Sequence, residues 1–224
     1  MDTEELLSKS RWKILKELAK APRSAVEIAK KTSQSVANVT QQLQLLEAYH
    51  LIKKASDEKD PKEHKPGKPK TRYLLSQEIL LTTVLKSGIA EKKVLKFKEA
   101  DDFQKFLINL FFIIDPEYHN HLIKFVSITD MIQKADTIAY LKSGEKEIEI
   151  MIITEHIKEV REKYSNMNVV GFDGKTKKII SWSHNKKEVE EGLERKEEYF
   201  INLVKNSIVL LDKKDYLAEL KQKL

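Results

Sequence analysis

Three amphipathic stretches follow one another at the start of the chain and predict a compact helical unit. The first stretch runs to Leu18 and is ended by the breaker sequence Ala21-Pro22-Arg23. Ser24 and Glu27 then have the spacing of a capping box, which begins a short second helix. A third helix is expected over residues 35–49, with an apolar stripe on one face. The residues of that stripe are Val36, Val39, Leu43 and Leu46.

Two short apolar runs come next and predict two strands, at residues 51–52 and 73–75. Residues 53–72 between them hold eight Lys or Arg, four Asp or Glu, three Pro and one Gly. This composition is typical of a long basic loop that joins the two strands. Three helices followed by such a hairpin predict a winged helix-turn-helix domain over residues 1–76.

The pattern of residues 77–98 predicts a further helix, a connector that could also serve self-association. Its packing face would hold Ile79, Leu80, Val84 and Leu85. Beyond it, strands alternate with helices over residues 99–224, which predicts a mixed-sheet α/β domain. The expected helices cover 100–114, 117–125, 155–164, 185–204 and the C-terminus, and the expected strands cover 137–141, 147–154, 168–172, 178–182 and 207–211, with a turn at Asp173-Gly174. The fold class is therefore α/β, or α+β over the whole chain.

The net charge of +6 is confined to the first third of the chain. Residues 1–76 hold 16 Lys and Arg against 10 Asp and Glu, whereas the remaining 148 residues hold 25 of each sign. This asymmetry indicates that the N-terminal part meets a polyanion. The absence of Cys excludes disulfides, zinc–thiolate sites and Cys nucleophiles. No apolar run approaches the ~18 residues of a membrane span, so we expect a cytoplasmic protein with no membrane partner. We also expect no metal and no cofactor.

The third predicted helix has an unusual polar face. Residues 34–44 contain no charged side chain, although 34% of the chain is charged. Asn and Gln can bind adenine through two hydrogen bonds, and an Ala methyl can contact the methyl group of thymine. Ser33 and Ser35 at the helix start are suited to a phosphate. The predicted base-reading residues are Gln34, Ala37, Asn38, Gln41 and Gln44. The alternative is a polar face in an unrelated three-helix domain.

The basic loop is expected to hold the DNA backbone or the minor groove beside this helix. The second half of the loop has no acidic residue after Glu63. Its cations are the predicted phosphate contacts, namely Lys65, Lys68, Lys70 and Arg72. The alternative is an ordinary solvated loop.

Residues 24–52 contain a second helix rich in small residues, a Thr/Ser turn and a third helix that ends in Leu-Leu-Glu-Ala-x-x-Leu-Ile. In these features the sequence resembles the ArsR-like and MarR-like winged helix-turn-helix regulators, over roughly residues 8–76. The resemblance implies a transcriptional regulator that binds double-stranded DNA. Such regulators usually read two half-sites one turn apart, so a homodimer is expected. The metal sensing of ArsR proteins is not carried over because it needs Cys ligands, and the effector is left open.

Residues 135–154 and 186–211 are similar to the core hairpin, charged helix and closing strand of polymerase-β-type minimal nucleotidyltransferases. The chain departs from that family at its motifs. Ala135-Asp136 stands in place of Gly-Ser, and Glu147-Ile148-Glu149 stands in place of Asp-x-Asp. We therefore expect no catalytic residue and at most a vestigial metal site at Glu147 and Glu149. The domain would serve sensing, dimerisation or partner docking. The alternative is a nucleotidyltransferase, or an antitoxin-like relative, that carries a DNA-binding module.

Overall fold

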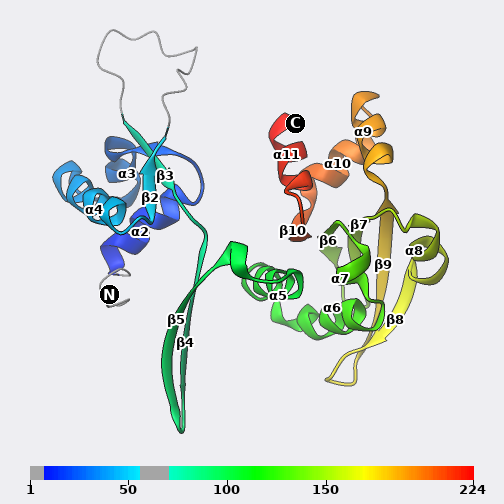
Figure 1. The fold of residues 1–224 in the computed structure, drawn as a ribbon. Coiled ribbons are helices and arrows are strands. Elements are labelled where there is room, and N and C mark those ends of the chain that lie inside the picture. The colour runs from blue at the N-terminus through cyan, green and yellow to red at the C-terminus, as the bar shows by residue number, and fades with distance from the viewer. Residues whose placement is uncertain (1–7, 56–70) are drawn as a thin grey trace. The chain divides into compact units, whose positions relative to one another are not determined.

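The computed structural model describes residues 8–55 and 71–224, and the chain divides into two compact units, Met1–Glu99 and Ala100–Leu224 (Figure 1). Together the units make an α/β protein with a mixed sheet in its C-terminal part, as the sequence predicts. No described helix is both long enough and apolar enough to cross a membrane.

Three helices form the core of the first unit. They are α2 (Lys9–Leu18), α3 (Ala25–Thr32) and α4 (Val36–Ala48). The predicted capping box is present, since the Ser24 hydroxyl accepts from the Glu27 N–H while the Glu27 carboxylate accepts from the Ser24 N–H. The buried side chains that join these helices are Ile14, Leu18, Ile28, Ala29, Val39, Leu43 and Leu46. Val36 is not among them, contrary to the predicted stripe, because it lies in the first turn of α4 and is 45% exposed.

A small antiparallel sheet completes this part of the first unit. Its strands are β1 (Arg23–Ser24), β2 (Ile52–Lys54) and β3 (Arg72–Leu75), in the order β1-β3-β2. Ile52 pairs with Leu75 and Lys54 with Tyr73, so the two predicted strands form an antiparallel pair. Most of the basic loop between them lies outside the described residues.

The predicted helical connector at 77–98 is wrong. The structure has a two-stranded antiparallel hairpin there, formed by β4 (Ile79–Lys86) and β5 (Ile89–Lys96), and a short 3₁₀ helix, η1 (Phe97–Glu99). Ser87 and Gly88 form the turn, and Gly88 has a φ of +83°, which Gly adopts without a steric cost. Thr82, Thr83 and Val84 are β-branched and favour the strand over the helix.

The second unit is built on a five-stranded mixed sheet with the order β10-β6-β7-β9-β8. Its strands are β6 (Thr137–Ser143), β7 (Glu147–Ile153), β8 (Asn166–Val170), β9 (Thr176–His184) and β10 (Ile208–Asp212). β7 and β9 run parallel and the other neighbours are antiparallel. Gly174 in the turn before β9 has a φ of +77°, as expected of the predicted turn.

Helices cover both faces of this sheet. They are α5 (Asp102–Ile113), α6 (Pro116–Ile128), α7 (Met131–Lys134), α8 (Ile157–Lys163), α9 (Lys186–Glu194), α10 (Glu198–Asn206) and α11 (Tyr216–Lys223). Ile148, Ile150 and Ile152 of β7 pack in a core with α5 to α8, whereas Met151 and Ile153 pack with α9 to α11. Successive side chains of β7 therefore point alternately into two hydrophobic cores, one on each face of the sheet.

The single helix predicted over residues 185–204 is also wrong, since α9 and α10 are separate helices. The chain turns between them at Lys196, whose φ is 55°. Gly192 is buried against the ring of Phe200, and a Cβ at Gly192 would lie 2.0 Å from Cδ2 of Phe200. The glycine thus permits the close approach of the two helices.

Candidate nucleic-acid interface

The turn between α3 and α4 consists of Ser33, Gln34 and Ser35. Ser33 is exposed and has left-handed backbone angles, with a φ of 56°, which reverses the chain at the end of α3. Ser35 caps α4 because its hydroxyl accepts from the N–H of Asn38 at 3.2 Å. The two serines are thus exposed at the start of α4, where they were predicted, and the Ser35 hydroxyl is engaged with the helix.

Gln34 and Asn38 belong to an internal polar cluster with Ser10 of α2. The Ser10 hydroxyl and the Asn38 amide both donate to Oε1 of Gln34, at 2.5 Å and 2.7 Å. Asn38 Nδ2 also lies 3.4 Å from the Ser10 hydroxyl oxygen, and Gln34 Nε2 donates to the Ser10 carbonyl. Both side chains are half-buried. Their amides hold α4 against α2, which leaves less of their hydrogen-bonding capacity for a base than the sequence predicted.

A second contact between the same helices involves Gln42. Its Oε1 accepts from Nε of Arg11 at 2.7 Å. Together with the Ser10 cluster, this contact fixes the rotation of α4 about its own axis. The sequence could not show which amides contact α2 and which are exposed. Gln34, Asn38 and Gln42 are polar amides in the same stretch as Gln41 and Gln44, and nothing in the sequence pattern separates the two sets.

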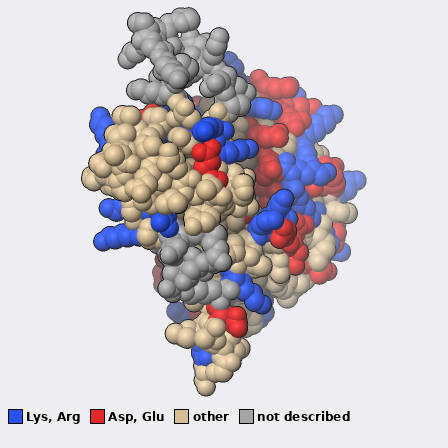
Figure 2. Space-filling model, turned by 60° about the vertical axis from the view of Figure 1, so that its left-hand side comes forward, with Lys and Arg blue, Asp and Glu red and all other residues tan. Residues whose placement is uncertain are grey.

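The outward surface of α4 is an uncharged stripe. Its residues occur at helical spacing and are all exposed, namely Ala37, Thr40, Gln41, Gln44 and Ala48. The amides of Gln41 and Gln44 have no hydrogen bond to any described residue. Thr40 donates to the Val36 carbonyl at 2.9 Å, so its hydroxyl is satisfied within the helix. Figure 2 shows a wide area without Lys, Arg, Asp or Glu on the side where the helices of the first unit lie.

Exposed cations flank the uncharged stripe in the sequence, both before and after α4. Lys30 and Lys31 are in the last turn of α3, before the Ser33 turn, and Lys53 is on β2, after α4. Lys54 pairs with Glu47 at 3.6 Å. An uncharged surface for bases and flanking cations for phosphates is the division of roles that DNA-binding helices use.

Arg72 lies at the base of the predicted wing, as the first residue of β3. Its guanidinium pairs with the carboxylate of Glu27 at 3.6 Å. The N–H of Ser24 and its hydroxyl, with Arg72 and Arg23 nearby, hold the pKa of Glu27 below its ordinary value. Arg72 is therefore partly neutralised from within the unit. The other predicted wing contacts, Lys65, Lys68 and Lys70, lie outside the described residues.

Of the two carboxylates in the predicted vestigial metal site of the second unit, Glu149 is engaged by neighbouring side chains. Glu149 accepts from Nε1 of Trp182 at 3.0 Å and pairs with Lys142 at 3.0 Å. Glu147 is exposed at the start of β7. Asp136, which directly precedes β6, pairs with Lys186 at 3.1 Å. Within residues 8–55 and 71–224, no group of three His, Asp or Glu side chains could hold a metal ion.

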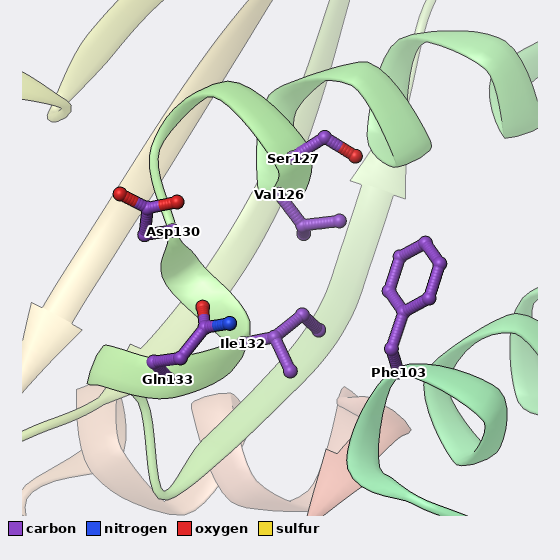
Figure 3. Close-up of a pocket in the computed structure, with 6 residues that line it drawn as sticks. All are labelled: Phe103, Val126, Ser127, Asp130, Ile132 and Gln133. Atoms are coloured by element: carbon purple, nitrogen blue, oxygen red, sulfur yellow. The ribbon is translucent and has the colours of Figure 1, made fainter.

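Two hollows lie on the second unit. One of about 190 Å³ lies between the start of α5 and the turn from α6 to α7 (Figure 3), and its lining residues are Phe103, Val126, Ser127, Asp130, Ile132 and Gln133. The other is more polar and follows the carboxyl ends of the parallel strands β7 and β9, a common ligand position in α/β sheets. Its lining residues are Glu155, His156, Ile157, Lys158, Glu159, Asn185 and Glu188.

Comparison with known proteins adds one match, in the N-terminal part. Residues 6–66 match a protein family described as HVO_A0114. The matched range begins before α2 and includes α3, α4 and β2. No curated protein matches the chain.

Proposed function

We propose that the protein is a sequence-specific DNA-binding transcriptional regulator. In this proposal α4 lies in the major groove of double-stranded DNA, and the loop between β2 and β3 contacts the backbone or the minor groove. The order of α2, β1, α3, α4, β2 and β3 supports the proposal because it is the order of a winged helix-turn-helix domain.

The observation that carries the proposal is the uncharged stripe of α4. A solvated helix face in a chain with 34% charged residues would normally hold Lys and Glu. Instead, Gln41 and Gln44 present amides with no hydrogen bond to any described residue beside the methyl of Ala37, and a separate set of amides anchors the opposite side of the helix. Free amides and methyl groups are the side-chain groups that read base edges in the major groove.

We limit the proposed base-reading residues to those on the exposed face of α4. Ala37, Gln41 and Gln44 are proposed to contact bases, and Ser33 and Ser35 are proposed to lie near a phosphate at the start of α4. Gln34 and Asn38 become positioning residues, which act through Ser10 to orient the helix.

The second unit is proposed to sense a ligand, to support dimerisation or to dock a partner. The polar hollow at the ends of β7 and β9 supports the first of these roles. Nucleotidyl transfer has no comparable support, because Glu149 is engaged by Lys142 and Trp182.

The proposal is tested by incubating the full chain with fragmented genomic DNA and sequencing the fragments that it retains. We expect enrichment of a small set of sites that share one sequence, each with a footprint on both strands. Uniform retention of all fragments would indicate binding to the backbone alone, and no retention would indicate a different partner. Either result would refute the proposal.

A further inference from the structure

The β4–β5 hairpin is a ribbon that carries apolar side chains on both of its faces, and most of them are exposed. Its residues pair from Ile79 with Lys96 to Lys86 with Ile89, and no third described strand joins it (Figure 1). One face holds Leu80, Val84, Ile89 and Leu95, and the other holds Leu81, Leu85, Ala90 and Val94. Leu85 is 84% exposed. An isolated two-stranded ribbon is only marginally stable in water, and pairing with further strands would stabilise it.

The two outer edges of the ribbon differ in charge. Residues 79–85 of β4 are all uncharged and include no Pro, whereas β5 carries Glu91, Lys92, Lys93 and Lys96. Proteins protect free strand edges with charged residues, above all Lys, because an unprotected edge pairs with other strands. The edge of β5 is protected in this way. The edge of β4 is not.

We infer that the β4 edge pairs with the β4 edge of a second copy of this chain. The two strands would run antiparallel about a two-fold axis at Thr82 and form a four-stranded sheet in the order β5-β4-β4-β5. The Lys-rich β5 strands would then lie at both outer edges, where they prevent further addition of strands. Such an isologous contact closes at the dimer.

Charge complementarity selects both the partner and the register. With Thr82 facing the partner's Thr82, Leu80 faces the partner's Val84 and Glu78 faces the partner's Lys86. The second copy repeats each pair, so two Glu–Lys pairs bracket the contact. Glu78 and Lys86 have no ion pair with any described residue of their own chain. A shift of one residue would place Glu78 opposite Ser87 or Leu85 of the partner subunit, and both ion pairs would be lost.

Aliphatic and hydroxyl pairs favour the same alignment. Ile79 faces the partner's Leu85, and Thr82 faces its own equivalent, which are cross-strand pairs that stabilise antiparallel sheets. On each face the aliphatic side chains of the two ribbons become continuous. The dimer would hold two copies of α4, although the inference itself needs no DNA and stands apart from the proposed function.

Single cysteines test the contact directly because the chain has no Cys of its own. In Thr82→Cys the two thiols would face each other across the axis. Opposed Cα atoms in an antiparallel pair are about 4.5–5.5 Å apart, within the range of a disulfide. We expect mild oxidation to convert this variant to a covalent dimer of twice 26.1 kDa.

The matched control is Lys93→Cys. Lys93 pairs with Thr82 within the hairpin, so it lies on the same face of the ribbon but on the outer strand. In the proposed sheet it is three strand spacings, about 14 Å, from its equivalent, and we expect it to form no covalent dimer under the same oxidation. A Thr82→Cys variant that does not cross-link, or two variants that cross-link equally, would overturn the inference.

Charge reversal tests the register. Glu78→Lys and Lys86→Glu each place like charges opposite one another twice per dimer, and we expect each to weaken dimerisation about 3- to 10-fold in sedimentation equilibrium. The double variant Glu78→Lys/Lys86→Glu restores both attractive pairs and should return to within about twofold of the original. Circular dichroism verifies the fold of all three. An unreversed chain that is monomeric at every concentration, or single variants that dimerise like it, would contradict the inference.

Discussion

The polar cluster behind α4 leads to a prediction that separates anchoring from recognition. Asn38→Ala removes the 2.7 Å hydrogen bond to Gln34 and the weak 3.4 Å contact with Ser10. Loss of these bonds costs about 1–2 kcal/mol at about 0.5–1.5 kcal/mol for each hydrogen bond. The better helix propensity of Ala returns at most about 0.7 kcal/mol. We therefore expect a net decrease of about 0.5–1.5 kcal/mol in the free energy of unfolding of the first unit.

Gln41→Ala is the matched control, because it removes the same kind of amide from the exposed face of the same helix. No hydrogen bond to a described residue is lost, so the free energy of unfolding should change by less than about 0.5 kcal/mol. Urea unfolding followed by Trp12 fluorescence reports the first unit, if Trp182 of the second unit is replaced by Phe in every variant. Equal stability of the Asn38→Ala and Gln41→Ala proteins would refute the anchoring role of Asn38.

Three further predictions concern the wing and the second unit. The first concerns the three lysines in the acid-free part of the loop, Lys65, Lys68 and Lys70. Their replacement by Ala should weaken binding to every DNA sequence. In fluorescence anisotropy titrations, the slope of log affinity against log salt concentration should fall by about one for each lost phosphate contact. Gly192→Ala should destabilise the second unit by about 1–3 kcal/mol, because its Cβ would overlap the Phe200 ring, and thermal unfolding would show a lower Tm. Burial lowers the pKa of His184 despite the opposing effect of Glu188. The neutral imidazole therefore contributes to folding stability above the unfolded pKa of about 6.5, and this contribution is lost as the pH falls through the lower folded pKa. Replacement of His184 by Gln should remove that part of the pH dependence in thermal unfolding.

The helices of the first unit could be predicted from the sequence because their signals are local. Ser24 and Glu27 form the expected capping box, and α4 begins at Val36, one residue after the expected start of the third helix. The rotation of α4 was not predictable in detail. Val36 has the spacing of a core residue but lies in the first turn of α4 and is exposed. The partner of Gln34 and Asn38 is Ser10, more than twenty residues away in the sequence.

The hairpin at 79–96 shows where hydrophobic spacing misleads. Ile79, Leu80, Val84 and Leu85 fit one face of a helix, yet they also fit a strand that is apolar on both faces. The β-branched residues and the Ser87-Gly88 turn decide the outcome, and they were available in the sequence as a signal for a hairpin. Likewise, nothing local marks the turn at Lys196, which depends on the packing of Phe200 against Gly192.

The site of the second unit illustrates a different limit. Glu147 and Glu149 alternate with apolar residues, as an ordinary amphipathic strand would, and the sequence alone could not show which partner each carboxylate has. The partners come from β6 and β9, because the sheet places Lys142 opposite Glu149 and brings Trp182 within hydrogen-bond distance. Pairing across strands is set by register, which no local pattern encodes.

The central claim is that the outward face of α4 reads base edges, and the most direct measurement is the base preference of the protein in a random pool of duplexes. The unchanged chain should select one defined site. A Gln41→Ala/Gln44→Ala variant should lose preference at a few adjacent base pairs, by about 5- to 150-fold for each bidentate contact, and keep its affinity for unrelated DNA and its salt slope. Selection of the same site with the same strength by that variant would contradict the account.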